Sequence, residues 1–204
     1  MRIISGNFKG KKLFLPKDKK TRPLKDIVKE SIFNLIKHSK KININIENSL
    51  VLDLFSGTGS FGIECLSRGS QKVFFFENYD EAVKVLEKNL NSLKNAKNFK
   101  IYKQNFFNFF SSEKNFNFNF DIIFIDPPYK EKNINQIIEK ILEKKLLNQN
   151  GILIFHRHKK DNINIVSFFI KKSPLNFLGF SSILILKQAH QKILQQYYQD
   201  KLEI

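Results

Sequence analysis

Short apolar runs alternate with amphipathic segments from residue 50 to residue 156, and this alternation limits the fold more than any other feature of the chain. The run FDIIFID, residues 120–126, is apolar enough to be covered on both faces, as a central parallel strand is. Between such runs, apolar residues recur at helical spacing, for example from Tyr79 to Leu93. Strands that alternate with helices form βαβ units. We therefore predict an α/β fold with a Rossmann-like, mostly parallel sheet.

Three regions are predicted along the chain. Residues 1–40 form a hairpin, RIIS and KLFLP joined through Gly6 and Gly10, followed by a helix, and this appendage is expected to contact RNA. Residues 41–187 form the main domain and residues 188–204 a helical tail. Predicted strands of the main domain span residues 49–55, 72–77, 99–103, 120–126, 151–156, 165–170 and 180–186, and predicted helices span 25–37, 60–67, 79–93 and 133–144.

The chain is strongly basic. Its 35 Lys and Arg residues against 19 Asp and Glu residues give a formal charge of +16 with histidine neutral. Such a surface attracts polyanions, and nucleic-acid phosphates come first among them. An AT-biased coding sequence, rich in Lys, Asn, Ile and Phe codons, is the alternative explanation. The residues predicted to bind RNA are Lys9, Lys11, Lys12, Arg22, Lys25 and Lys29.

Several classes of protein and site are excluded or disfavoured. The single cysteine, Cys65, cannot form an internal disulfide, and a core position in a reducing compartment suits it. No apolar run approaches the roughly 20 residues that span a bilayer, and the N-terminus lacks a signal-peptide pattern, so we expect a soluble cytoplasmic protein. We also expect a monomer. His156 and His158 flank Arg157 without a third ligand at a persuasive spacing, so we expect surface or RNA-contacting residues and no metal site.

A glycine-rich loop follows the first strand of the main domain. Asp53 ends that strand, and residues 57–62 satisfy G-x-G-x-x-G at a strand-to-helix turn, where a backbone can approach a ligand closely. Glu77 lies 20 residues beyond Gly57, at the end of the next strand, where a carboxylate accepts hydrogen bonds from ribose hydroxyls. The pattern predicts a nucleoside-containing cofactor, and nicotinamide or flavin enzymes use the same turn.

The sequence Asp126-Pro127-Pro128-Tyr129 ends another strand, at the edge of the sheet where α/β proteins bind ligands. The two prolines stiffen the turn and remove two backbone donors. An exocyclic amino group presents two N–H donors, which the Asp126 carboxylate and the Pro127 carbonyl are able to accept, while Tyr129 is placed to stack on a base. This combination predicts an enzyme that acts on the amino group of a nucleic-acid base.

These motifs resemble those of the bacterial 16S rRNA guanine-N2 methyltransferases of the RsmD type. The resemblance rests on VLDLFSGTGSFGIECLSRGSQKVFFFE and DIIFIDPPY, with MRIISGNFKGKKL and TRPLKDIVKESIFNLI upstream, and it extends to about Lys187. It implies a class I S-adenosylmethionine-dependent methyltransferase fold with an antiparallel strand at one sheet edge, preceded by a small hairpin region. It also implies S-adenosylmethionine as cofactor, 16S rRNA of the small ribosomal subunit as partner, and transfer to guanine N2.

The resemblance implies roles for two sets of residues. The catalytic set, which receives the guanine, is Asp126, Pro127, Pro128 and Tyr129, and the cofactor-binding set is Asp53, Phe55, Gly57, Gly59, Glu77, Asn105 and Phe106. At position 105 the family usually has an aspartate that binds the adenine amino group, and the asparagine here accepts without a charge. Two other functions stay open: a DNA adenine-N6 or cytosine-N4 methyltransferase, and a non-catalytic RNA-binding assembly factor.

Overall fold

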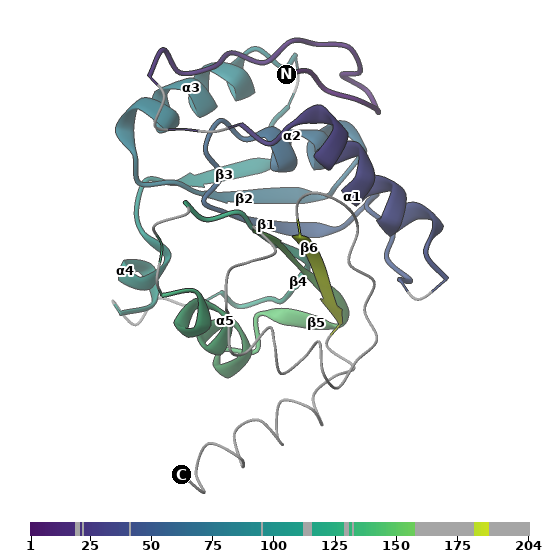
Figure 1. Ribbon diagram of the computed structural model, residues 1–204, viewed down its shortest axis with the longest axis vertical. Coiled ribbons are helices and arrows are strands. Elements are labelled where there is room, and N and C mark those ends of the chain that lie inside the picture. The colour runs from purple at the N-terminus through teal and green to yellow at the C-terminus, as the bar shows by residue number, and fades with distance from the viewer. Residues whose placement is uncertain are drawn as a thin grey trace, which may run out of the picture.

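The structure is a computed structural model that describes residues 1–18, 21, 23–40, 42–94, 96–111, 116–128, 131, 133–157 and 182–187. The helices are α1 (Asp26–His38), α2 (Ser60–Ser67), α3 (Asp80–Asn91), α4 (Phe106–Ser111) and α5 (Ile134–Glu143), and the strands are β1 (Leu50–Leu54), β2 (Lys72–Phe76), β3 (Phe99–Tyr102), β4 (Phe120–Ile125), β5 (Leu147–Arg157) and β6 (Ser182–Lys187). The strands form one sheet in the order β3-β2-β1-β4-β5-β6 (Figure 1).

Strands β1 to β5 pair in parallel, which confirms the predicted α/β sheet. The strand β6 pairs antiparallel with β5, with Ile154 opposite Ile185. The chain order reverses at β1, because β2 and β3 lie on one side of it and β4 and β5 on the other. This reversal is the switch point at which open α/β sheets bind ligands beyond the carboxyl ends of their strands.

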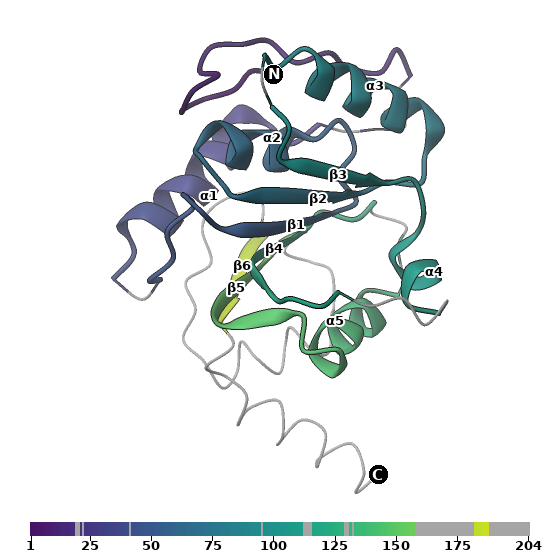
Figure 2. The same cartoon turned by 180° about the vertical axis from the view of Figure 1, so that it is seen from behind.

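Helices cover both faces of the sheet, because the central strands are apolar on both sides (Figure 2). On one face, Val51, Phe75 and Phe124 pack in a core cluster with residues of α1, α2 and α3. On the other face, Leu52 and Ile123 belong to a second cluster with residues of α4 and α5. The phenylalanine-rich segment after β3 contributes rings to this second core, since Phe106, Phe109 and Phe110 are all buried. The sheet therefore lies between two layers of helices, α1 to α3 on one face and α4 and α5 on the other.

The N-terminal residues form a short hairpin that lies on the main sheet domain. Arg2 and Lys12 form an antiparallel bridge, and the amide of Gly10 donates to the Ile3 carbonyl at 2.8 Å. The hairpin approaches α2 closely, because the Asn7 amide donates to the Ser67 carbonyl at 2.7 Å. Gly6 has φ +80°, and a Cβ atom there would lie 1.8 Å from the Ser67 oxygen. Only glycine permits this approach.

Two buried polar side chains fix the hairpin in place. The Glu64 carboxylate on α2 accepts the amides of Ile4 and Ser5 at 2.7 and 2.9 Å. The Asn89 side chain on α3 accepts the Phe14 amide at 2.7 Å and donates to the Thr58 carbonyl at 3.0 Å. Asn89 therefore connects the end of the hairpin to the glycine-rich loop, and the N-terminal segment runs along α2 and α3 (Figures 1 and 2).

Some predicted elements differ from the observed ones or cannot be compared. The strand predicted over residues 151–156 begins earlier, at Leu147, and ends at Arg157. The strand predicted over 165–170 and the tail from 188 lie outside the described residues. Within the described part of the chain, no helix combines the length and the apolar character needed to cross a bilayer.

Candidate active site

The loop between β1 and α2 has the backbone shape that a ligand-binding turn requires. Phe55 has φ 59°, a left-handed conformation that is costly for a bulky residue and is found mainly at functional sites. Gly59, at the N-terminus of α2, has φ +82°, and a Cβ atom there would lie 2.4 Å from a methyl carbon of Leu86. The second glycine of the motif is thus required for the turn itself and for the packing of α3 behind it.

Asp53 stabilises this loop through a buried hydrogen bond. Its side chain is 1% exposed, and its Oδ2 accepts the Gly62 amide in the first turn of α2 at 2.9 Å. Burial raises the pKa of Asp53 well above its usual range, and the nearby Asp126 and Glu77 carboxylates act in the same direction. Through this hydrogen bond the Asp53 carboxyl group holds α2 to β1, and its role at the cofactor pocket stays a prediction.

Glu77, directly after β2, is held by three backbone amides. Its Oε2 accepts the Gly57 amide at 2.7 Å, and its Oε1 accepts the amides of Asn78 and Tyr79 at 2.9 Å each. A carboxylate accepts about four hydrogen bonds, so the group retains capacity for a ligand hydroxyl. The spacing of 20 residues between Gly57 and Glu77 thus corresponds to a direct contact between the glycine-rich loop and the acidic strand end.

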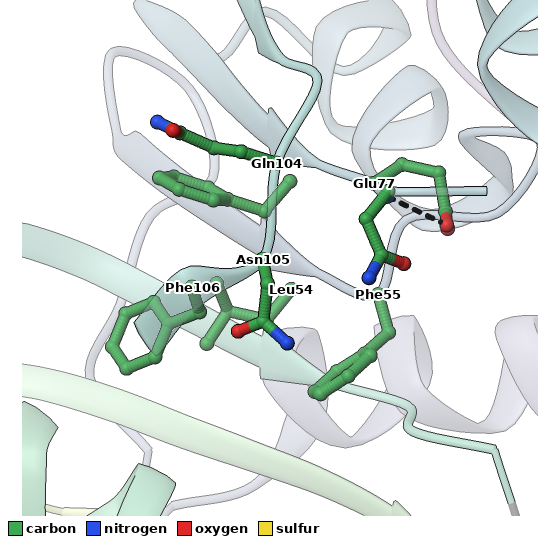
Figure 3. A pocket seen from close by; sticks show the side chains of 8 residues that line it. Leu54, Phe55, Glu77, Gln104, Asn105 and Phe106 are labelled. Atoms are coloured by element: carbon green, nitrogen blue, oxygen red, sulfur yellow. Dashed lines mark hydrogen bonds between the residues drawn. The ribbon is translucent and has the colours of Figure 1, made fainter. Parts of the chain in front are cut away.

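An open pocket lies beside Glu77 (Figure 3). Its lining residues come from the ends of β1, β2 and β3 and are Leu54, Phe55, Phe76, Glu77, Asn78, Gln104, Asn105 and Phe106. Four of the seven predicted cofactor-binding residues, Phe55, Glu77, Asn105 and Phe106, are therefore brought together. Gly57 and Gly59 shape the adjoining loop and do not line this pocket. Aromatic walls with a single carboxylate suit a nucleoside, whose base is flat and whose ribose carries hydroxyls.

Asn105 has a structural function at this pocket that the sequence did not suggest. Its Oδ1 accepts the Phe107 amide at 2.7 Å, as the side chain of a helix N-cap does at the start of α4. The oxygen keeps a second lone pair, and the amide nitrogen supplies two donors. The residue thus presents both an acceptor and donors at the edge of the pocket.

Asp126 lies at the carboxyl end of β4 and contacts a histidine that sequence reasoning had assigned to the surface. His156 Nδ1 lies 2.9 Å from Asp126 Oδ1. Pro127 is buried and Pro128 is exposed, whereas Tyr129 lies outside the described residues. His156 lies within β5, which extends to Arg157. One sequence feature was consistent with this contact: Asp126 and His156 each end an apolar run, and the two runs form the neighbouring strands β4 and β5.

The basic residues predicted to bind RNA separate into three groups. Lys9, Lys12 and Lys25 are exposed. Lys11 is half-buried, and its ammonium group donates to the Ser92 carbonyl. Lys29 is fully buried, where it donates to the Arg2 carbonyl at 2.6 Å and lies 3.7 Å from Glu64. The prediction for Lys29 is therefore wrong, because its ammonium group cannot reach a phosphate.

Residues before α1 approach the glycine-rich loop. The Thr21 methyl carbon lies 3.3 Å from the place that a Cβ atom on Gly57 would occupy. Nearby, the Tyr79 hydroxyl donates to Asp18 Oδ2 at 2.8 Å, and this hydrogen bond is the main cause that raises the pKa of Tyr79. Arg22 itself lies outside the described residues. The N-terminal segment therefore contributes to the rim of the candidate site.

The fold is that of solved methyltransferase structures. The precorrin-6y C5,15-methyltransferase from Geobacter metallireducens has the same fold, with a TM-score of 0.59 at 16% identity over 78% of this chain and 76% of that one. A hypothetical protein from Thermus thermophilus, TTHA0928, superposes with a TM-score of 0.71 at 20% identity, covering 92% of this chain and 99% of that one. At these identities the likeness establishes the fold.

Sequence comparison identifies the family within this class. The model of the family described as Conserved hypothetical protein 95 matches residues 1–172. Ribosomal RNA small subunit methyltransferase D from Haemophilus influenzae is 33% identical over 160 residues, which is 78% of this chain and 79% of that protein. The chain belongs to this family, which confirms the resemblance found in its motifs.

Proposed function

We propose that the protein transfers a methyl group from S-adenosylmethionine to N2 of a guanine in 16S rRNA of the small ribosomal subunit. The observation that carries this proposal is the Asp126 carboxylate, which directly follows β4, stands in front of two prolines and, like Glu77, lies near enough to Asp53 to raise the pKa of that group. A family relative named as a small-subunit rRNA methyltransferase supports the choice of polymer.

The residues of the site fit the cofactor. The aromatic side chains of Phe55 and Phe106 provide apolar walls for an adenine ring, and Glu77 provides an acceptor for ribose hydroxyls. Carboxylates at positions 77 and 126 favour a cation, although the chain as a whole is strongly basic. When bound, the cofactor supplies a methyl group that its sulfonium makes electrophilic.

Asp126 and Pro127 would hold the substrate amine. The lone pair of an exocyclic amino nitrogen is delocalised into its ring, so its reactivity depends on orientation and on charge stabilisation. One oxygen of Asp126 and the carbonyl of Pro127 would accept the two N–H groups, so that positive charge developing on nitrogen is stabilised. Tyr129 would stack on the base. The proton then leaves from the methylated amine to Asp126 or to solvent.

Exposed lysines would position the RNA. Lys9 and Lys12 are exposed on the N-terminal hairpin, and Lys25 is exposed directly before α1. Contacts to phosphates give affinity without reading sequence, and they weaken as salt concentration rises. We propose a cytoplasmic monomer that uses this surface to place one guanine at Asp126.

The proposal is tested by methyl transfer from radiolabelled S-adenosylmethionine to small subunits, free 16S rRNA and DNA, followed by nucleoside mass spectrometry. N2-methylguanosine in the RNA is the expected product, whereas methylated adenine or cytosine in DNA would overturn the assignment. Asp126→Ala should reduce transfer by at least about 100-fold, as expected when a group that orients the reacting atom is lost, and should leave S-adenosylmethionine binding within about twofold of wild type. Transfer at the wild-type rate would contradict the role given to Asp126.

A further inference from the structure

The juxtaposition of His156 and Asp126 across β4 and β5 indicates a role for this histidine. We propose that His156 is a positioning residue: its Nδ1–H donates to Asp126 Oδ1 and so leaves Oδ2 free to accept an N–H of the target amine. The inference rests on the proposed function, because it concerns the group that holds the amine. It assigns a chemical role to a side chain that nothing in the motif pattern connects to Asp126.

The sheet register brings the two residues together. Ile125 on β4 pairs with Phe155 on β5 in a parallel ladder, so residues 126 and 156 are the next pair along the same two strands. Side chains of paired residues in adjacent parallel strands point to the same face of a sheet. The end of β4 and the paired strand β5 therefore set the 2.9 Å separation between Nδ1 and Oδ1.

The prolines explain why Asp126 needs a donor from another strand. An aspartate that ends a strand commonly accepts an amide hydrogen bond from the residue two positions later, which fixes its carboxylate locally. Here the following positions are Pro127 and Pro128, which have no amide hydrogen. The two prolines therefore remove the local amide hydrogen bond that would otherwise orient the Asp126 carboxylate. The His156 ring nitrogen supplies a hydrogen bond in its place.

The chemistry of the pair sets the direction of the hydrogen bond. An ionised carboxylate has no hydrogen to give, so Nδ1 is the donor and carries the proton. Both side chains are partly accessible, with 18% exposure for His156 and 25% for Asp126. Hydrogen bonds between partly accessible groups contribute little to folding. Loss of the histidine should therefore change the orientation of the carboxylate far more than the stability of the fold.

The test uses four substitutions in the full chain: His156→Leu, His156→Asn, His156→Gln and, as a matched control, His38→Leu at the exposed last residue of α1. The asparagine amide occupies the place of Nδ1, whereas the glutamine amide extends to the place of Nε2. We expect kcat for methyl transfer to fall about 10- to 100-fold in the leucine and glutamine variants. The asparagine variant should stay within about fivefold of wild type, and KM for S-adenosylmethionine and thermal midpoints should be unchanged throughout.

Equal kcat in wild type and His156→Leu would overturn the role of His156 and leave the proposed function standing. An asparagine variant as slow as the glutamine variant would also overturn it, since a donor at the Nδ1 position would then not matter. If the leucine variant fails to fold, the comparison of asparagine with glutamine decides. A wild-type protein that binds S-adenosylmethionine but methylates no guanine in small subunits or 16S rRNA would overturn the proposed function, and this inference with it.

Discussion

Replacing Lys29 by methionine separates a structural role from an RNA-binding role for this residue. The Lys29 ammonium group is buried between the hairpin and α2, where it donates to the Arg2 carbonyl at 2.6 Å and lies 3.4 Å from Ser60 Oγ. Burial lowers the pKa of Lys29, and the neighbouring Glu64 and Asp26 carboxylates oppose this effect. Methionine preserves the length and apolar stem of the side chain and removes its charge and donors.

The expected loss of stability follows from the contacts that remain. Removal of a hydrogen bond from a charged group costs about 1.5–3 kcal/mol, and breaking one side of a buried ion pair costs about 3–5 kcal/mol. Glu64 keeps Arg68 Nε at 2.9 Å and the amides of Ile4 and Ser5. The cost should therefore lie near the lower value of the second range, about 3 kcal/mol. For a chain of 204 residues this is a fall of about 6–12 °C in Tm.

Urea unfolding followed by circular dichroism measures the free energy, and filter binding at fixed salt measures RNA affinity. Lys25→Met is the matched control, because Lys25 is exposed one turn away. It should change stability by less than about 0.5 kcal/mol and weaken RNA binding. A Lys29→Met protein of wild-type stability with weaker RNA binding would refute the reasoning, since it would mean that the ammonium group reaches phosphate.

Two further predictions concern the loop of the candidate site. Burial raises the pKa of Asp53 in the folded state, so the unfolded chain loses that proton at a lower pH than the folded protein does. The contribution of Asp53 to stability therefore falls as pH rises from the pKa of the unfolded chain toward the raised pKa of the folded protein. Asp53→Asn should remove this dependence of the free energy of unfolding on pH. Urea unfolding of both proteins across the same pH range measures it, and an identical pH dependence in the two proteins would contradict the burial argument. Gly59→Ala should destabilise the protein by about 1–3 kcal/mol, because alanine is strained at positive φ and its Cβ would meet Leu86. Thermal melting and S-adenosylmethionine titration check this variant, and unchanged values for both would refute it.

The site combines rigid and strained parts in a way that suits its proposed chemistry. All three of its acidic groups, Glu77, Asp126 and Asp53, have hydrogen-bond partners, and Asp53 is also buried. The left-handed backbone of Phe55 lies at the wall of the pocket. Fixed acceptors lose little freedom when a ligand binds, which preserves affinity and orientation.

Local patterns in the chain were sufficient for the sheet and for part of the site. Apolar runs and helical spacing predicted the elements, because helices and strands each impose a regular spacing on the apolar side chains that face the core. The glycine loop and Glu77 were predictable for a similar reason, since a βαβ unit brings the ends of two consecutive strands together. The hydrogen bond from the Gly57 amide to Glu77 shows that these two strand ends meet.

Tertiary structure alone decided the partners of Lys29, Asp53 and His156. The distance along the chain is 35 residues from Lys29 to Glu64 and 30 from Asp126 to His156, and no local period links positions so far apart. A lysine on a helix has the same sequence pattern whether it faces solvent or a buried glutamate. The packing of α1 against the hairpin and α2 buried Lys29, and the register of β4 with β5 placed His156 at Asp126.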